Sequence, residues 1–94
     1  MTEAADSTGE PQAPEIDFGM FVMSLASSVL VHLGEIAHPE SQHPERNLPL
    51  AKQTLDILGL LQEKTRGNLT KEETELIDNL LYDLRLKYVE AKKR

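Results

Sequence analysis

The chain has 94 residues, of which 39% are hydrophobic and 28% charged, a composition typical of one soluble globular domain. Its formal net charge of −6 argues against nucleic-acid binding, because phosphate contacts need a basic surface. It contains no cysteine, which excludes disulfides, thiol catalysis and cysteine-bound metals and suits a reducing cytoplasm, the expected location.

The first 15 residues, MTEAADSTGEPQAPE, are acidic, contain two prolines and show no apolar periodicity. Such a segment cannot bury enough apolar surface to offset the entropy lost on ordering. We therefore expect a disordered acidic tail over residues 1–15 and a single helical domain over residues 16–94. No positive residue precedes Arg46, which argues against a secretory signal sequence.

The most apolar segment, FGMFVMSLASSVLVHL, predicts a helix over about residues 17–34, with Asp17 as its N-cap and Gly34 as its stop. Because the segment is short and interrupted by serines, we do not expect it to span a membrane. On a helical wheel one broad arc forms the expected core face: Phe18, Val22, Met23, Leu25, Ala26, Val29, Leu30, Leu33 and Ile36. Met20, Phe21 and Val31 lie on the opposite side, among serines, where a monomer would expose them to water.

The segment HPESQHPERN predicts a loop, because it is polar and contains two prolines. A second helix follows over about residues 48–66, with Asn47 as N-cap and Pro49 in the first turn. Its expected core stripe consists of Leu50, Ala51, Leu55, Ile57, Leu58 and Leu61. Gly59 lies on the polar side, where it costs about 1 kcal/mol of helix propensity relative to Ala. Close approach of another helix would explain it.

The stretch KTRGNLTKEE predicts a helix end, a short turn and a new helix start. Gly67 suits the left-handed position after a helix, and Thr70 with Glu73 matches a capping box. We interpret N-L-T as part of this turn rather than as a glycosylation acceptor, because nothing directs the chain to the secretory pathway. So short a connection predicts antiparallel neighbouring helices.

The third predicted helix covers about residues 71–91 and has apolar side chains on two faces. The main stripe is Leu76, Ile77, Leu80, Leu81, Leu84 and Tyr88. Tyr82, Leu86 and Val89 form a smaller patch on the opposite face, at i, i+4 and i+7. A helix with two apolar faces usually contacts two neighbours.

Three blocks of the sequence, DFGMFVMSLASSVLVHLGE, NLPLAKQTLDILGLLQEKTRGNLT and LIDNLLYDLRLKYVE, occur in this order. With them the chain resembles, over about residues 17–89, a family of short bacterial proteins called domain of unknown function 1844. The resemblance implies a small bacterial helical protein. It supplies no reaction, ligand or partner, because the family is functionally uncharacterised.

Two groups of residues invite a chemical interpretation. Ser28, His32 and Glu35 share a helical face in the manner of a nucleophile, a base and an orienting acid, but one helix face supplies neither a rigid pocket nor an oxyanion hole. His38 and His43, each followed by a proline and an acid, are candidate metal ligands with Glu40 or Glu45. Loop ligands lose entropy on ordering, and zinc sites need three or four ligands. We therefore expect no catalytic residue, no metal and no cofactor.

The sequence thus predicts an all-α bundle of three helices that acts as a non-enzymatic interaction or scaffolding protein. Surplus apolar surface on so small a domain favours a homo-oligomer, most simply a symmetric dimer, and leaves another protein partner open. The expected interface residues are Met20, Phe21, Ser24, Ser28 and Val31 in the first helix and Tyr82, Leu86 and Val89 in the third.

Two alternatives remain. One is a peripheral membrane-surface protein using the first helix, although that helix lacks the Lys and Arg typical of such proteins. The other is a metal binder or enzyme using His32, or His38 with His43.

Overall fold

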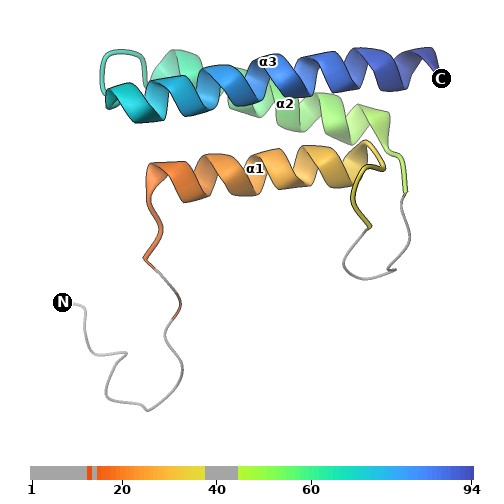
Figure 1. Ribbon diagram of the computed structural model, residues 1–94, viewed down its shortest axis with the longest axis horizontal. Coiled ribbons are helices and arrows are strands. Elements are labelled where there is room, and N and C mark those ends of the chain that lie inside the picture. Colours follow the sequence, from red (N-terminus) through yellow and green to blue (C-terminus); the bar gives the residue numbers. More distant parts are fainter. Residues whose placement is uncertain (1–12, 14, 38–44) are drawn as a thin grey trace.

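The computed structural model describes residues 13, 15–37 and 45–94, and three helices account for most of them: α1 (Phe18–His32), α2 (Leu48–Lys64) and α3 (Lys71–Lys93). Consecutive helices run antiparallel, and each of the three helices packs against the other two (Figure 1). Within the described ranges there is no strand, only one isolated bridge. The predicted all-α three-helix bundle is confirmed. The predicted tail, except Ala13 and Glu15, and most of the predicted loop lie outside these ranges.

Each helix begins directly after the residue that the sequence predicts as its N-cap. The Asp17 carboxylate accepts a hydrogen bond from the Met20 amide at 2.8 Å, and the Asn47 side chain accepts one from the Leu50 amide at 3.1 Å. These bonds satisfy amides that have no partner within the helix.

Three predicted helix ends are displaced by two residues. α1 ends at His32 instead of residue 34, because the chain turns into a left-handed conformation at Gly34, where φ is 82°. α2 ends at Lys64 instead of residue 66. α3 continues to Lys93 instead of ending at residue 91. Lys92 and Lys93 lie in this last turn, where their positive charges interact favourably with the helix dipole.

The turn between α2 and α3 has the conformation that its sequence predicts. Gly67 has a φ of 87°, a left-handed conformation that residues with a Cβ rarely adopt. The Thr70 hydroxyl accepts from the Glu73 amide at 3.1 Å, and the Glu73 carboxylate accepts from the Thr70 amide at 2.9 Å. This capping box starts α3 directly after the turn, so α2 and α3 pack as antiparallel neighbours.

The core is a small aliphatic cluster to which all three helices contribute. Its most deeply buried large side chains are Val22, Val29 and Leu33 at α1, Leu58 in α2, and Ile77 and Leu81 in α3. Burying one such side chain fully stabilises a fold by about 1.5–3 kcal/mol. A core of this size leaves much apolar surface uncovered.

Four residues expected in the core are exposed instead: Met23, Ile36, Leu50 and Ile57. Met23, Leu50 and Ile57 lie at the margins of their helices' apolar arcs, beyond the side chains that the two neighbouring helices cover. Ile36 lies past the end of α1. The prediction was wrong for these four because a helical wheel gives the apolar arc but not the narrower arc that neighbours bury.

The two ends of the segment between α1 and α2 are joined at its base. Leu33 and Arg46 form the antiparallel bridge, and the Asn47 amide donates to the His32 carbonyl at 2.7 Å. The Arg46 guanidinium also donates to the Ala91 carbonyl near the end of α3 at 2.6 Å. This bond ties the C-terminal end of α3 to the start of α2, and Ala91 is fully buried beneath it.

Candidate interaction surfaces

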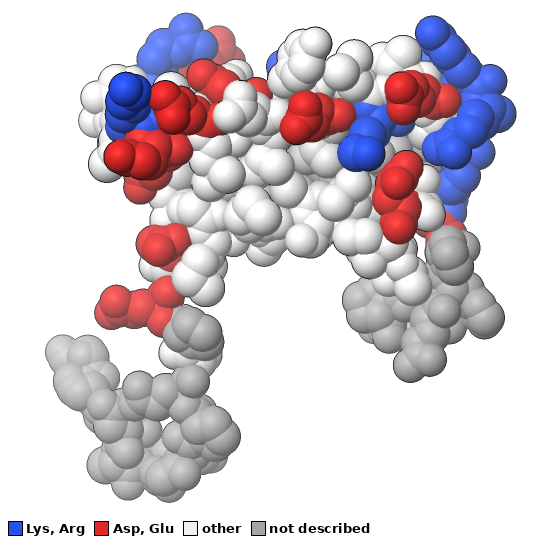
Figure 2. Space-filling model, viewed as in Figure 1, with Lys and Arg blue, Asp and Glu red and all other residues white. Residues whose placement is uncertain are grey.

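The outward face of α1 is uncharged and exposed. The helix contains no Asp, Glu, Lys or Arg at all. Met20 and Phe21 are each 41% exposed, Ser24 is exposed, and Ser28 and Val31 are half-buried. In Figure 2 the surface along α1 is white, whereas red and blue side chains gather over α3 and at the two ends of the bundle. All five residues predicted for the first interface therefore retain accessible surface.

The serines on this face are small and make it only weakly polar. The Ser24 hydroxyl donates to the Phe21 carbonyl of its own helix at 2.7 Å. A hydroxyl bonded in this way needs no partner from solvent. Because serine side chains are small, Ser24 and Ser28 leave depressions between the larger side chains. Another helix can approach closely at these positions.

Exposed apolar side chains of α2 extend the uncharged area. Leu50 and Ile57 lie on the side of α2 opposite Gly59, the residue at which α2 meets α3. By the helical register this side is turned toward α1. The apolar surface is consequently wider than α1 alone.

The outer face of α3 carries a second exposed apolar cluster. Tyr82 is 66% exposed, Leu86 49% and Val89 46%. These three residues border a groove of about 420 Å³ that is also lined by Gln62, Asp78, Leu81 and Arg85. The predicted patch on α3 is thus accessible, and it adjoins a groove between α2 and α3.

Gly59 gives the Arg85 side chain room to cross from α3 to α2. A Cβ at Gly59 would lie 2.9 Å from an Arg85 guanidinium nitrogen. The helix α2 thus has a residue of poor helix propensity at the position where Arg85 reaches it. Sequence reasoning suggested close approach of a helix at Gly59, and the structure assigns that approach to a single side chain.

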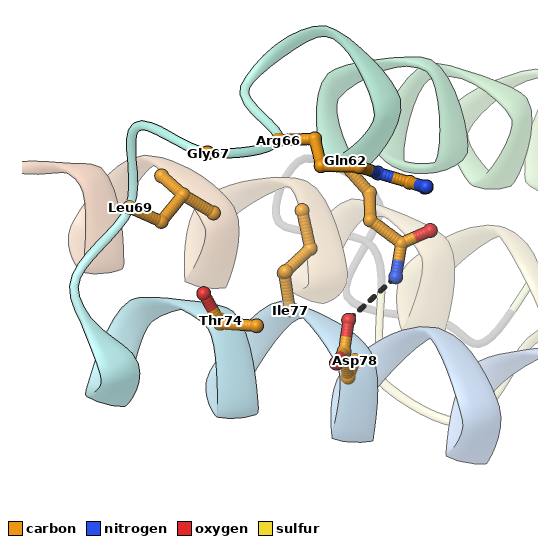
Figure 3. A pocket seen from close by; sticks show the side chains of 7 residues that line it. All are labelled: Gln62, Arg66, Gly67, Leu69, Thr74, Ile77 and Asp78. Carbon is orange, nitrogen blue, oxygen red and sulfur yellow. Dashed lines mark hydrogen bonds between the residues drawn. The ribbon is translucent and has the colours of Figure 1, made fainter.

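A pocket of about 380 Å³ lies beneath the turn between α2 and α3 (Figure 3). Leu69 and the fully buried Ile77 give it an apolar lining. The Gln62 side-chain amide donates to the Asp78 carboxylate at 2.6 Å across it, and the exposed Arg66 belongs to the lining. Asp78 is the one carboxylic acid among these lining residues, and no histidine lies beside it, so the lining offers no acid–base pair and we regard the pocket as structural.

Among the described residues, Ser28, His32 and Glu35 do not form one catalytic face. Because α1 ends at His32, Glu35 lies outside the helix and does not continue the face that carries Ser28 and His32. Across residues 15–37 and 45–94, no three side chains of His, Asp or Glu gather as a metal site would require. His38, Glu40 and His43 lie outside the described ranges, so the structure does not test the metal hypothesis for them.

None of the helices in the described part of the chain has both the length and the apolar character needed to cross a membrane.

Comparison with known proteins identifies a family and no characterised relative. No protein with a curated description and no solved structure matches the chain. The family described as Domain of unknown function (DUF1844) matches residues 15–90, a range that contains all of α1 and α2 and nearly all of α3. The chain therefore belongs to this family, domain of unknown function 1844.

Proposed function

We propose that this protein is a non-enzymatic interaction protein of the cytoplasm that acts as a homo-oligomer, with the outward face of α1 as its self-association surface. The observation that carries the proposal is a helix with no charged side chain whose Met20, Phe21 and Ser24 remain exposed. A surface helix of a soluble monomer usually has charged residues on its outward face, whereas the centres of protein interfaces are depleted of charge.

The spacing along α1 favours a second copy as the partner. Phe21, Ser24, Ser28 and Val31 follow one another at steps of three, four and three residues. In an antiparallel pairing about a two-fold axis at the level of residue 26, Phe21 lies opposite Val31 of the second copy and Ser24 lies opposite Ser28. Larger side chains then meet across the axis and small ones leave room for close approach.

The size of the surface indicates that α2 also contributes. A helix of 15 residues is only about 22 Å long, and stable interfaces bury about 800 Å² on each partner. α1 alone is too small for such an interface. Leu50 and Ile57, exposed on the side of α2 turned toward α1, provide additional apolar area.

The test is a double charge substitution on this face, Phe21→Glu with Val31→Glu. Each glutamate would be placed against the other copy's glutamate, so we expect the mass in solution to fall to half that of the wild type at the same concentration. The matched control is Asn68→Glu with Thr74→Glu, which makes the same change in charge at exposed positions in the α2–α3 turn and the first turn of α3, outside the proposed interface. Circular dichroism verifies that both variants remain helical.

Two results would contradict the proposal. One is that the variant and the control have the same mass as the wild type. The other is a monomeric wild type that co-sediments with lipid vesicles and loses this binding in the variant, because the face would then bind a membrane.

A further inference from the structure

The outer face of α3 carries a row of residues with the spacing of a coiled-coil seam. Alternating steps of four and three residues connect Glu75, Asn79, Tyr82, Leu86, Val89 and Lys93, and all six are exposed. This spacing keeps a row of side chains on one face of a helix that packs along another helix. In the isolated bundle, however, the row faces solvent.

The row is self-complementary in the antiparallel direction. Its exposed middle is apolar, and its two ends, Glu75 and Lys93, carry opposite charges. If a second α3 packs about a two-fold axis at the level of residue 84, Tyr82 lies opposite Leu86 of the second copy. In the same register Glu75 lies opposite Lys93 of that copy, and symmetry creates both pairs twice.

The charge of the whole helix favours the same orientation. Residues 71–84 contain five acids and one base, whereas residues 85–94 contain five bases and one acid. Figure 2 shows blue side chains gathered at the end of the bundle where α3 finishes. An antiparallel copy sets the acidic half of one α3 against the basic half of the other, and a parallel copy would set like charges together.

We propose that the outer face of α3 is a second self-association surface, on which another copy of this chain packs its own α3 antiparallel through Tyr82, Leu86 and Val89. This face is separate from the α1 surface, because α3 meets α1 through other residues: a Cβ at Gly19 of α1 would lie 3.7 Å from Leu76. The inference goes beyond the proposed function and does not depend on it. Where both surfaces are used, two different two-fold contacts assemble the chain beyond a dimer.

Two charged residues lie close to the proposed axis. Arg85 would approach its own symmetry mate, but the space over Gly59 lets its guanidinium lie against α2 instead. Asp83, also exposed, would approach the Asp83 of the second copy, so Asp83→Asn is expected to tighten the association. The row from Glu75 to Lys93 is only about 27 Å long. A single helix pair of this length makes a small interface, and we expect it to dissociate on dilution.

Disulfide trapping tests the orientation, and the absence of native cysteine makes single-cysteine variants unambiguous. Glu75→Cys and Lys93→Cys proteins are oxidised separately and as a mixture. The antiparallel contact predicts a covalent dimer in the mixture and none with either variant alone, because equivalent positions are then about 27 Å apart. A mixture without covalent dimer, or equal trapping of each variant alone, would overturn the proposal.

Charge exchange tests the contact by a second route. Lys93→Glu is introduced into the Phe21→Glu, Val31→Glu protein, so that the α1 surface does not contribute. We expect a dissociation constant about tenfold higher, because two symmetry-related pairs change from attraction to repulsion. Adding Glu75→Lys restores opposite charges and should return the constant to its starting value.

The outcomes separate the two proposals. If Lys93→Glu leaves the dissociation constant unchanged, or if this parent protein shows no association at all, the α3 contact is wrong and the proposed function is unaffected. If Phe21→Glu with Val31→Glu fails to lower the mass of the wild type, the proposed function is wrong, and trapping between residues 75 and 93 still tests α3.

Discussion

Replacing Gly59 by alanine should stabilise the protein. Alanine in a helix interior is favoured over glycine by about 1 kcal/mol. The new Cβ would lie 2.9 Å from an Arg85 guanidinium nitrogen, which is the end of a flexible, exposed side chain and can move. After the cost of moving it we expect a net gain of about 0.5–1 kcal/mol, or a rise in melting temperature of about 4 °C.

A double-mutant cycle with Arg85→Ala, followed by urea unfolding at one protein concentration, tests whether the Arg85 side chain limits this gain. Without the Arg85 side chain, Gly59→Ala should give the full gain of about 1 kcal/mol. Gly67→Ala is the matched control: the same substitution at a φ of 87° should destabilise by about 1 kcal/mol or more. If Gly59→Ala destabilises the protein in both backgrounds, something other than Arg85 occupies that space and the argument is refuted.

Three further substitutions test the caps and the core by thermal or urea unfolding. Thr70→Ala removes the hydroxyl of the capping box and should cost about 1 kcal/mol, whereas Thr74→Ala, one turn later at an exposed position, should cost less. Leu58→Ala removes most of a fully buried side chain and should lower the free energy of unfolding by about 2–5 kcal/mol. This is comparable to the whole stability of a domain this small, so a variant that stays fully folded would contradict the described core. Arg46→Ala removes the donor to the Ala91 carbonyl and should speed hydrogen exchange of the last α3 amides while leaving the start of α3 unchanged.

The features that could be predicted from the sequence depend on residues close together in the chain. Asp17, Asn47 and Thr70 cap the helices as expected because each bonds an amide three residues later. The left-handed Gly67 follows the same local logic. The exposed patch of Tyr82, Leu86 and Val89 was also predictable, since the opposite face of α3 already has a complete apolar stripe.

The features that could not be predicted depend on how the helices are placed relative to one another. Ile57 and Met23 belong to apolar arcs, yet they are exposed because the neighbouring helices cover only part of each arc. Arg46 holds the end of α3 across 45 residues of sequence, and no local pattern marks that bond. The role of Gly59 required knowing that Arg85 lies above it.

The proposed function requires that a second copy of the chain covers the uncharged face of α1. The most direct test is the absolute mass of the full-length wild-type protein by light scattering across a dilution series. For a chain of 10.5 kDa, we predict a mass of at least twice that value at high concentration, falling toward it on dilution. A mass of 10.5 kDa at every concentration would contradict the claim.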